Sequence, residues 1–274
     1  MRDELKDEEY FKKCIQNNVN SINKLINKLD SKEVPFDRVP IVKQSIAYSF
    51  FSKLNAKYSI GENPNNLIND LSICIDLMNE SWVNNSAKVN IDGEDEYLDQ
   101  YYASTYVQML QILSLGYLLN IADKDFQKLV KIIDRDNVCD KLFEFIIKKK
   151  STDRKQKCPE QYDSKLSVIL KVYDKLRKAT MLTEKAEAAK LIKQFLENDW
   201  SQLLIKYDCI TGPKESKYNL YSGLWCFEAA AVVKIMGLDD SSFIDNQYYP
   251  KDLVHQSTNE TLPKKKGLLG RLGF

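Results

Sequence analysis

Apolar residues spaced three and four positions apart recur along almost the whole chain, and this spacing restricts the fold more than any other feature. The first such stripe comprises Phe11, Ile15, Val19, Ile22, Ile26 and Leu29. This spacing places the residues on one face of an α-helix, whereas the alternating pattern typical of strands is missing. The sequence therefore predicts an all-α protein, a multi-helix bundle with two consecutive helical domains or layers packed together.

Glycine, proline and capping residues mark the predicted helix ends. A second helix ends at Gly61, and Asn63-Pro64 opens a third, with asparagine as the cap and proline in the first helical position. Asp123 is predicted to cap a later helix in the same way. Two long helices are predicted over residues 94–119 and 220–236, and the second of them ends at Gly237 in a left-handed cap.

Charge and composition predict three parts of the chain: an N-terminal helical domain over residues 1–125, a C-terminal helical domain over 126–256, and a flexible basic tail over 257–274. Four of the 40 Lys and Arg residues and none of the 39 Asp and Glu residues lie in the last eleven positions, so the rest carries a net charge of −3. A basic stretch over 148–157 is interpreted as an exposed connection. The apolar residues of the tail leave open a contact with a membrane or a partner groove.

Six cysteines are scattered along the chain without a C-x-x-C pair, which predicts free thiols in a reducing cytoplasm. They are Cys14, Cys74, Cys139, Cys158, Cys209 and Cys226. The charged first ten residues lack the apolar stretch of a signal peptide, and no apolar run approaches the roughly 20 residues that cross a bilayer. We therefore expect a cytoplasmic protein.

Catalytic and cofactor motifs are scarce in this sequence. His255 is the only histidine, whereas helical di-iron sites and H-E-x-x-H zinc sites need at least two. A phosphate-binding G-x-x-x-x-G-K-[ST] loop is also missing. The sequence therefore predicts that the protein is not an enzyme and binds no cofactor or metal, although a metal site built from carboxylates alone stays open.

Acidic residues cluster around three tyrosines in the middle of the chain, and no Lys or Arg lies between Lys88 and Lys124. One interpretation is structural, since acids in a first helical turn stabilise a helix by roughly 0.3–1 kcal/mol each. The other is a surface for a basic partner, which aromatic residues anchor and charges steer. With two later acids, the predicted partner-binding residues are Asp92, Glu94, Asp95, Glu96, Tyr97, Asp99, Tyr102, Asp239 and Asp240.

Glu228 is the only polar residue between Leu224 and Val233. A buried carboxylate is costly unless it is paired, hydrogen-bonded or protonated. We therefore expect an ion pair or a hydrogen bond from a tyrosine, with a direct functional role as the alternative.

Several short motifs carry a resemblance to a known family. They are Trp225, Phe227 to Ala231, Gly237 to Ser241 and Tyr248 to Leu253 in the second half, and Arg2-Asp3, Glu8 to Phe11 and Ala56 to Gly61 in the first. In these motifs the chain resembles PoNi-type immunity proteins, which protect bacteria against PoNe-type DNase toxins. We expect Trp225, Glu228, Tyr249 and Asp252 to be structural residues of this motif.

The resemblance implies a protein that binds and inhibits a cognate nuclease toxin, with no nucleic acid, membrane or small molecule as partner. A nuclease that holds DNA presents a basic cleft, which an acidic surface complements. A non-catalytic adaptor or effector chaperone of a secretion system is the alternative from another class. An enzyme with a carboxylate-bound metal is the third.

Overall fold

Helices make up nearly all regular structure in the computed structural model, which confirms the predicted all-α class. The structure describes residues 1–91, 96–155, 171–200, 202 and 221–255. Contacts divide the chain into two units. Of the described residues, the first unit comprises 1–81, 221–223 and 255, and the second comprises 82–91, 96–155, 171–200, 202 and 224–254. The predicted tail over 257–274 lies outside the described residues.

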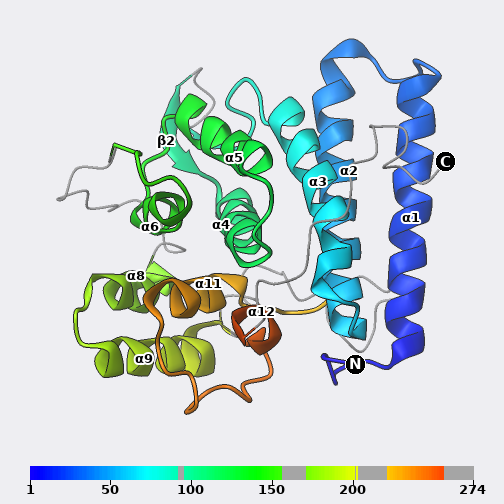
Figure 1. Ribbon diagram of the computed structural model, residues 1–274. Coiled ribbons are helices and arrows are strands. Elements are labelled where there is room, and N and C mark those ends of the chain that lie inside the picture. Colours follow the sequence, from blue (N-terminus) through cyan, green and yellow to red (C-terminus); the bar gives the residue numbers. More distant parts are fainter. Residues whose placement is uncertain (92–95, 156–170, 201, 203–220, 256–274) are drawn as a thin grey trace. The chain divides into compact units, whose positions relative to one another are not determined.

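Three long helices form the first unit: α1 (Glu8–Asp30), α2 (Val39–Ile60) and α3 (Ile68–Ser81), with short 3-10 helices η1 (Phe36–Arg38) and η2 (Pro64–Leu67). The middle helix, α2, packs against both α1 and α3 (Figure 1). It ends at Gly61, as predicted, and this glycine lies in the left-handed region with φ 102° and ψ 15°. Asn63 accepts a hydrogen bond from the N–H of Asn65 at 2.9 Å and so caps η2, which leads directly into α3.

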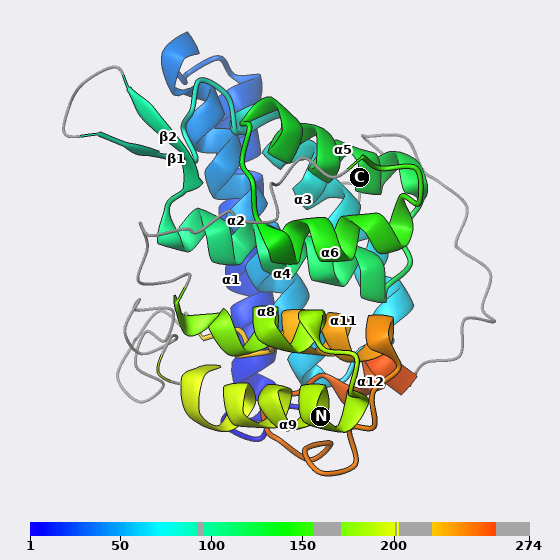
Figure 2. The same cartoon turned by 90° about the vertical axis from the view of Figure 1, so that its left-hand side faces the viewer.

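The second unit is built around α11, a helix whose residues 227–233 are all buried. This helix packs against α4, α6, α8 and α9 (Figure 2). A helix with so few polar residues belongs in a core, and three consecutive alanines allow its neighbours a close approach. The helices of this unit are α4 (Ala103–Leu118), α5 (Asp123–Arg135), α6 (Lys141–Lys150), α8 (Asp174–Met181), α9 (Lys185–Gln194), η3 (Phe195–Trp200), α11 (Phe227–Met236) and α12 (Lys251–His255).

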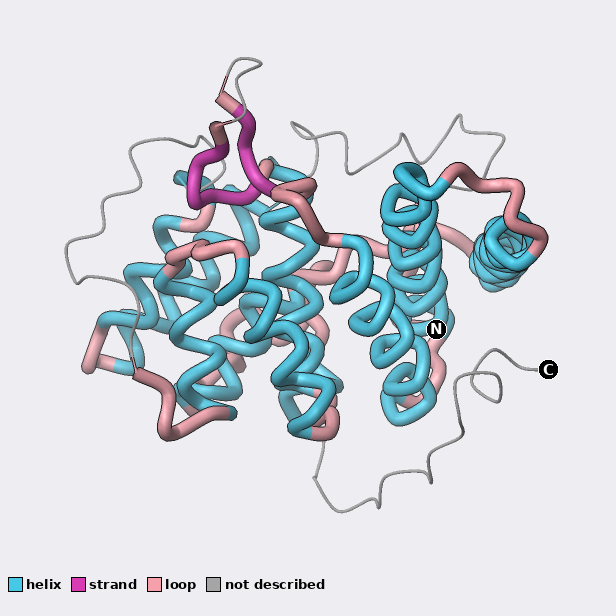
Figure 3. The backbone as a smooth tube through the Cα atoms, turned by 90° about the horizontal axis from the view of Figure 1, so that it is seen from above, coloured by secondary structure: helices cyan, strands magenta, loops and turns pink. Residues whose placement is uncertain are grey.

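A small antiparallel hairpin interrupts the helices of the second unit. Its strands are β1 (Lys88–Asn90) and β2 (Tyr97–Tyr101), with Lys88 opposite Tyr101 and Asn90 opposite Tyr97. The hairpin projects from the helices of its unit (Figures 2 and 3). The helix predicted from residue 94 is therefore wrong at its start, because α4 begins at Ala103. Tyrosine favours a pleated, half-buried strand, so the helical spacing was misleading here.

The last long helix also begins later than predicted. Gly223 has a φ of 124°, which interrupts a helix, and the N–H of Cys226 donates to the carbonyl oxygen of Tyr248 at 2.8 Å. Trp225 therefore precedes α11 and does not share a helix face with its residues. The predicted left-handed end of this helix is confirmed at Gly237, with φ 60° and ψ 51°. At α5, Ala122 is the cap and Asp123 is already helical.

The structure tests two further expectations, that the cysteines are free thiols and that no helix crosses a membrane. Cys14, Cys74 and Cys226 are free and buried, as predicted, but Cys139 is disulfide-bonded, so the prediction of free thiols is wrong for that residue. Among the described residues no helix is both long and apolar enough to cross a bilayer.

Candidate functional site

The hairpin brings together Glu96, Tyr97, Asp99 and Tyr102 of the predicted partner-binding residues, and we call these four the hairpin surface. Glu96 and Tyr102 are exposed, the latter by 43%, and Tyr97 is half-buried. Tyr102 accepts a hydrogen bond at its hydroxyl from the N–H of Asn90 at 3.2 Å, which ties it to β1. The surface thus offers acids and aromatic rings together. Asp92, Glu94 and Asp95 lie outside the described residues.

Asp99 is held by two polar partners. Lys88 Nζ on the opposite strand lies 2.7 Å from its Oδ1, and Asn137 Nδ2 donates to its Oδ2 at 2.6 Å. No Lys or Arg lies within the acidic run, but the pairing of the two strands brings Lys88, at the edge of that run, within reach of Asp99. The Asp99 side chain remains 51% exposed, so it contributes to the surface as a partly neutralised carboxylate.

The base of the hairpin is fixed by Tyr101, which is buried. Its ring packs edge-on against Trp82 at 5.3 Å between centroids. Its hydroxyl donates to Asp136 Oδ2 at 2.9 Å, at the C-terminal end of α5. Burial, together with the charge of Asp136, raises the pKa of Tyr101, so the hydroxyl stays a donor. Arg135 completes the anchor, because it donates both to Asp136 and to the carbonyl oxygen of Trp82.

Two further tyrosine–carboxylate pairs continue into the core of the second unit. Tyr106 donates to Asp140 at 3.1 Å, and Tyr173 donates to Glu228 at 2.7 Å. The two tyrosine rings lie 5.7 Å apart. Arg177 donates to the hydroxyl of Tyr106 at 3.3 Å, which adds a cation beside the first pair. Neither pair was identified from the sequence, since the partners are 34 and 55 positions apart.

Glu228 is fully buried, and burial raises its pKa to about 7 despite the hydrogen bond from Tyr173. Desolvation thus outweighs the hydroxyl, which by itself would favour the charged form. The expectation of a hydrogen bond from a tyrosine is confirmed. Within the described residues, no group of three or more His, Cys, Asp and Glu side chains is placed to hold a metal ion.

The later pair of predicted acids is divided between surface and interior. Asp239 is exposed and accepts a hydrogen bond from the N–H of Ser241 at 3.0 Å, which lowers its pKa. Asp240 is 5% exposed and accepts a hydrogen bond from the hydroxyl of Tyr249 at 2.8 Å. This segment and the hairpin lie at opposite ends of the second unit (Figures 1 and 2).

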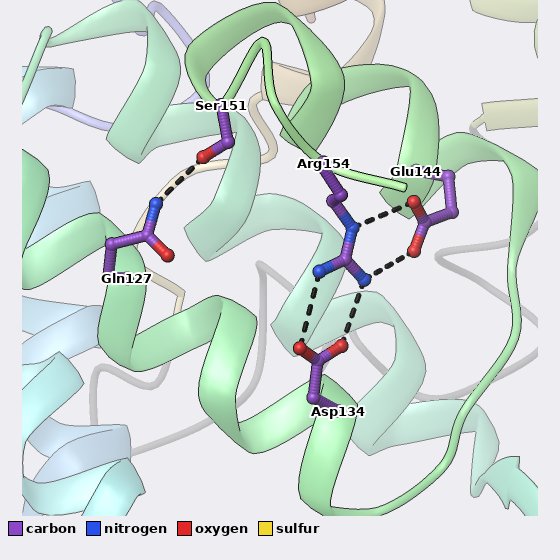
Figure 4. Close-up of polar contacts among 5 residues, drawn as sticks. All are labelled: Gln127, Asp134, Glu144, Ser151 and Arg154. Carbon is purple, nitrogen blue, oxygen red and sulfur yellow. Dashed lines mark hydrogen bonds and ion pairs between the residues drawn. The ribbon is translucent and has the colours of Figure 1, made fainter. Parts of the chain in front are cut away.

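Arg154 lies in the basic stretch that was interpreted as an exposed connection, and for this residue that is wrong. Its guanidinium donates to both carboxylate oxygens of Glu144, at 2.8 and 2.5 Å, and to those of Asp134, at 2.9 and 3.3 Å (Figure 4). The side chains of Arg154 and Glu144 are 8% and 5% exposed. Beside them, Gln127 donates to Ser151 at 2.7 Å. These contacts hold the chain after α6 against α5.

Comparison with known families assigns both halves of the chain. Residues 2–131 match the model described as PoNe immunity protein (PoNi), N-terminal, and residues 138–253 match its C-terminal counterpart. The chain belongs to the PoNi family of PoNe immunity proteins. Membership gives it an immunity function against a toxin, and such proteins are generally not enzymes. No curated protein and no solved structure matches the chain.

The two PoNi models meet between residues 131 and 138, whereas the first two long segments of the contact-defined units meet between Ser81 and Trp82. Family boundaries describe which segments occur together in sequences, and contact boundaries describe which segments pack together. The predicted domain boundary at residue 125 stays a prediction.

The first-half residues that carry the PoNi resemblance gather at the C-terminal end of α2. Arg2 Nη1 donates to the carbonyl oxygens of Tyr58 and Glu62 at 2.9 and 2.8 Å, and its guanidinium lies over the Tyr58 ring. Asp3 accepts a hydrogen bond from the hydroxyl of Tyr221 at 2.6 Å. Arg2 thus adds a second donor to the Tyr58 carbonyl oxygen, which already accepts from the N–H of Gly61, and binds the Glu62 carbonyl oxygen just beyond the helix end. In this PoNi protein the cluster stabilises the first unit.

The predicted structural residues of the second half also lie mainly inside this PoNi protein. Trp225 is 5% exposed, Glu228 is fully buried and Tyr249 is 2% exposed. Asp252 is half-buried in the first turn of α12. Of the predicted partner-binding residues that the structure describes, the hairpin surface and Asp239 are therefore the accessible ones.

Proposed function

We propose that this PoNi-family protein protects the cell that makes it by binding a cognate DNase toxin and blocking it without catalysis. The observation that carries the proposal is the family match over residues 2–131 and 138–253, because it includes both halves of an immunity protein. The DNase class of the toxin and the blocking mechanism are both part of what we propose.

The hairpin surface is our candidate for the contact with the toxin. Glu96 supplies an exposed negative charge, Asp99 a partly neutralised one, and Tyr102 an exposed aromatic ring. A DNase must attract a polyanion and therefore carries basic residues, which acids on the inhibitor complement. Asp92, Glu94 and Asp95 extend the same acidic sequence and remain part of the proposal. Asp239 is a second candidate at the other end of the unit, and buried Asp240 is left out.

Co-expression tests the proposed function. The gene of the cognate PoNe-type toxin is induced in a sensitive host with and without the protein, and genomic DNA integrity and colony counts are measured. We expect survival and intact DNA only when the protein is present. Equal killing in both cultures would refute the proposal. Binding of the toxin without loss of its DNase activity would instead identify an adaptor or chaperone.

We further propose that the protein acts in the cytoplasm, where a toxin that cleaves the genome would have to be stopped. The disulfide at Cys139 is the observation that opposes this, because disulfides persist mainly in oxidising compartments. Cell fractionation with thiol trapping tests the location. Recovery in the periplasmic fraction with Cys139 protected from alkylation would contradict it.

A further inference from the structure

A groove of about 510 Å³ lies between α9 and the segment that follows α11. Lys185, Lys190 and Lys193 line its α9 side, and Asp239 and Ser241 line the opposite side. We call it the α9 groove. The segment after α11 runs alongside α9 in both views of the unit (Figures 1 and 2).

The charges of the α9 groove are predominantly positive. Lys190 is exposed, and Lys193 lies 3.9 Å from Glu197, a distance at the outer limit of an ion pair. Lys185 donates to the carbonyl oxygen of Gly237 at 3.3 Å, so it also closes the end of α11. Asp239 is the one acid among the lining residues, and the N–H of Ser241 already satisfies one of its oxygens.

The surface between the lysines suits a peptide segment. Ala186 and Ala189 line the groove on α9, and Gly237 lines it on the facing segment. These small residues leave room for a main chain, and the lysines that line the same groove supply amines for its side chains. The volume falls within the roughly 300–1,000 Å³ that ligand sites usually have. The combination of small apolar lining and positive rim fits an anionic peptide better than a neutral one.

We propose that the α9 groove is a second contact for the toxin and binds a segment of it that carries carboxylates. The proposal rests on the proposed function. Nucleases hold their catalytic metal ions with acidic residues, so a DNase carries acids as well as a basic DNA-binding surface. The hairpin surface complements the basic part and the α9 groove complements an acidic part. Because they lie at opposite ends of the second unit, they contact separate parts of the toxin.

The test compares two double charge reversals that change the net charge equally. Lys190→Glu with Lys193→Glu reverses the groove, and Lys124→Glu with Lys131→Glu reverses two exposed lysines of α5. Binding of each variant to the cognate PoNe-type toxin, made as a catalytically inactive protein, is measured by calorimetry after melting curves confirm folding. We expect the groove variant to bind at least about tenfold more weakly and the α5 variant within about twofold of wild type.

Equal binding by the groove variant and wild type would overturn the inference and leave the proposed function intact. Failure of the wild-type protein to bind the toxin would overturn both.

Carbodiimide coupling of the wild-type complex identifies the chemistry of the contact. This reagent joins lysine amines to carboxylates that touch them, and mass spectrometry locates the joined residues. We expect Lys190 or Lys193 to be joined to an Asp or Glu of the toxin. Coupling only at lysines elsewhere would contradict the inference. Binding of inorganic phosphate is measured in parallel. Micromolar phosphate binding that needs Lys190 but does not compete with the toxin would also contradict the inference.

Discussion

Acids and tyrosines occur together both on the hairpin and in the core of the second unit, but their surroundings differ. On the hairpin, Glu96 is exposed and the Asp99 side chain is 51% exposed. In the core, Asp136 and Glu228 are 6% and 0% exposed, and each accepts a hydrogen bond from a tyrosine hydroxyl. The same residue types therefore serve different purposes, depending on how much water reaches the carboxylate.

The difference follows from the cost of moving a charge out of water. A buried carboxylate destabilises the fold unless a donor or cation satisfies it, so its partners become structural residues. An exposed carboxylate costs little and gains little from a surface ion pair, so its charge remains available to another molecule. Substitutions at the two kinds of site should accordingly separate stability from toxin binding.

The largest expected effect is at Arg154, the cation between two carboxylates. Arg154→Ala leaves Glu144, 5% exposed, without its bidentate partner, so we expect a loss of about 3–5 kcal/mol in the free energy of unfolding. Denaturant titration measures the loss. Lys155→Ala, at the exposed neighbouring residue, is the control and should stay within about 0.5 kcal/mol. An equal change in both variants would mean that the Arg154 contacts do not stabilise the core.

The next effect depends on pH and comes from Glu228. Its pKa is about 7 in the folded protein and near 4.5 when unfolded, so the folded state holds the proton more tightly. The stability contributed by the protonated form is complete below pH 4.5 and is lost as the pH rises through 7. Over that window we expect a loss on the order of 3 kcal/mol.

Glu228→Gln removes this titration and keeps an acceptor for Tyr173. Its stability relative to wild type should therefore rise between pH 5 and pH 8, as measured by urea unfolding at each pH. Glu187→Gln on α9, where the residue is exposed, is the control and should show no such change. Parallel pH profiles for wild type and Glu228→Gln would contradict the assigned pKa.

A smaller effect is expected at the base of the hairpin, where the hairpin meets the core of the second unit. Tyr101→Phe keeps the ring against Trp82 but leaves Asp136 without its hydroxyl donor. We expect a loss of about 1–3 kcal/mol in unfolding free energy, because within the described part of the chain the Asp136 carboxylate then keeps only its contact with Arg135. A loss below about 0.5 kcal/mol would show that the hydroxyl contact does not anchor the hairpin.

The smallest effect on stability and a clear effect on binding are expected at the hairpin surface. Glu96→Lys should change the unfolding free energy by less than about 0.5 kcal/mol. Toxin association should slow several-fold at low salt and approach the wild-type rate at high salt, because screening removes the steering force. Stopped-flow mixing at two salt concentrations measures this.

Asp153→Lys, also exposed in the second unit, is the matched control for Glu96→Lys and should associate at the wild-type rate. If both variants slowed equally, net charge and not the hairpin surface would account for the effect. If neither slowed, the hairpin would be excluded as the steering surface.

Much of the fold was predictable from local patterns. The buried faces of α2 and α3 follow the three-and-four spacing, and Gly61 and Gly237 end their helices in the left-handed region. The hairpin was missed because its tyrosines and leucine also fit a helical spacing. The Asp92-Gly93 dipeptide, which is typical of hairpin turns, was the signal that could have revealed it.

The candidate site was less predictable, because exposure and pairing depend on distant residues. Nothing near Asp240 in the sequence distinguishes it from Asp239, yet Asp240 is buried beside the Tyr249 hydroxyl and Asp239 is exposed. Likewise, Lys88 lies outside the acidic run and reaches Asp99 only across the strand pair. The lysines of the α9 groove were not singled out, since lysines on an exposed helix face are common.

By itself, the sequence determined the helical class, most helix ends and the motifs that identify a PoNi-family protein, because each depends on residues within a few turns of one another. Only the tertiary structure decided which acids are buried beside tyrosines, which remain exposed on the hairpin, and which lysines face a groove. Those outcomes depend on desolvation and on partners tens of residues away, such as Tyr173 for Glu228, and no local pattern encodes them.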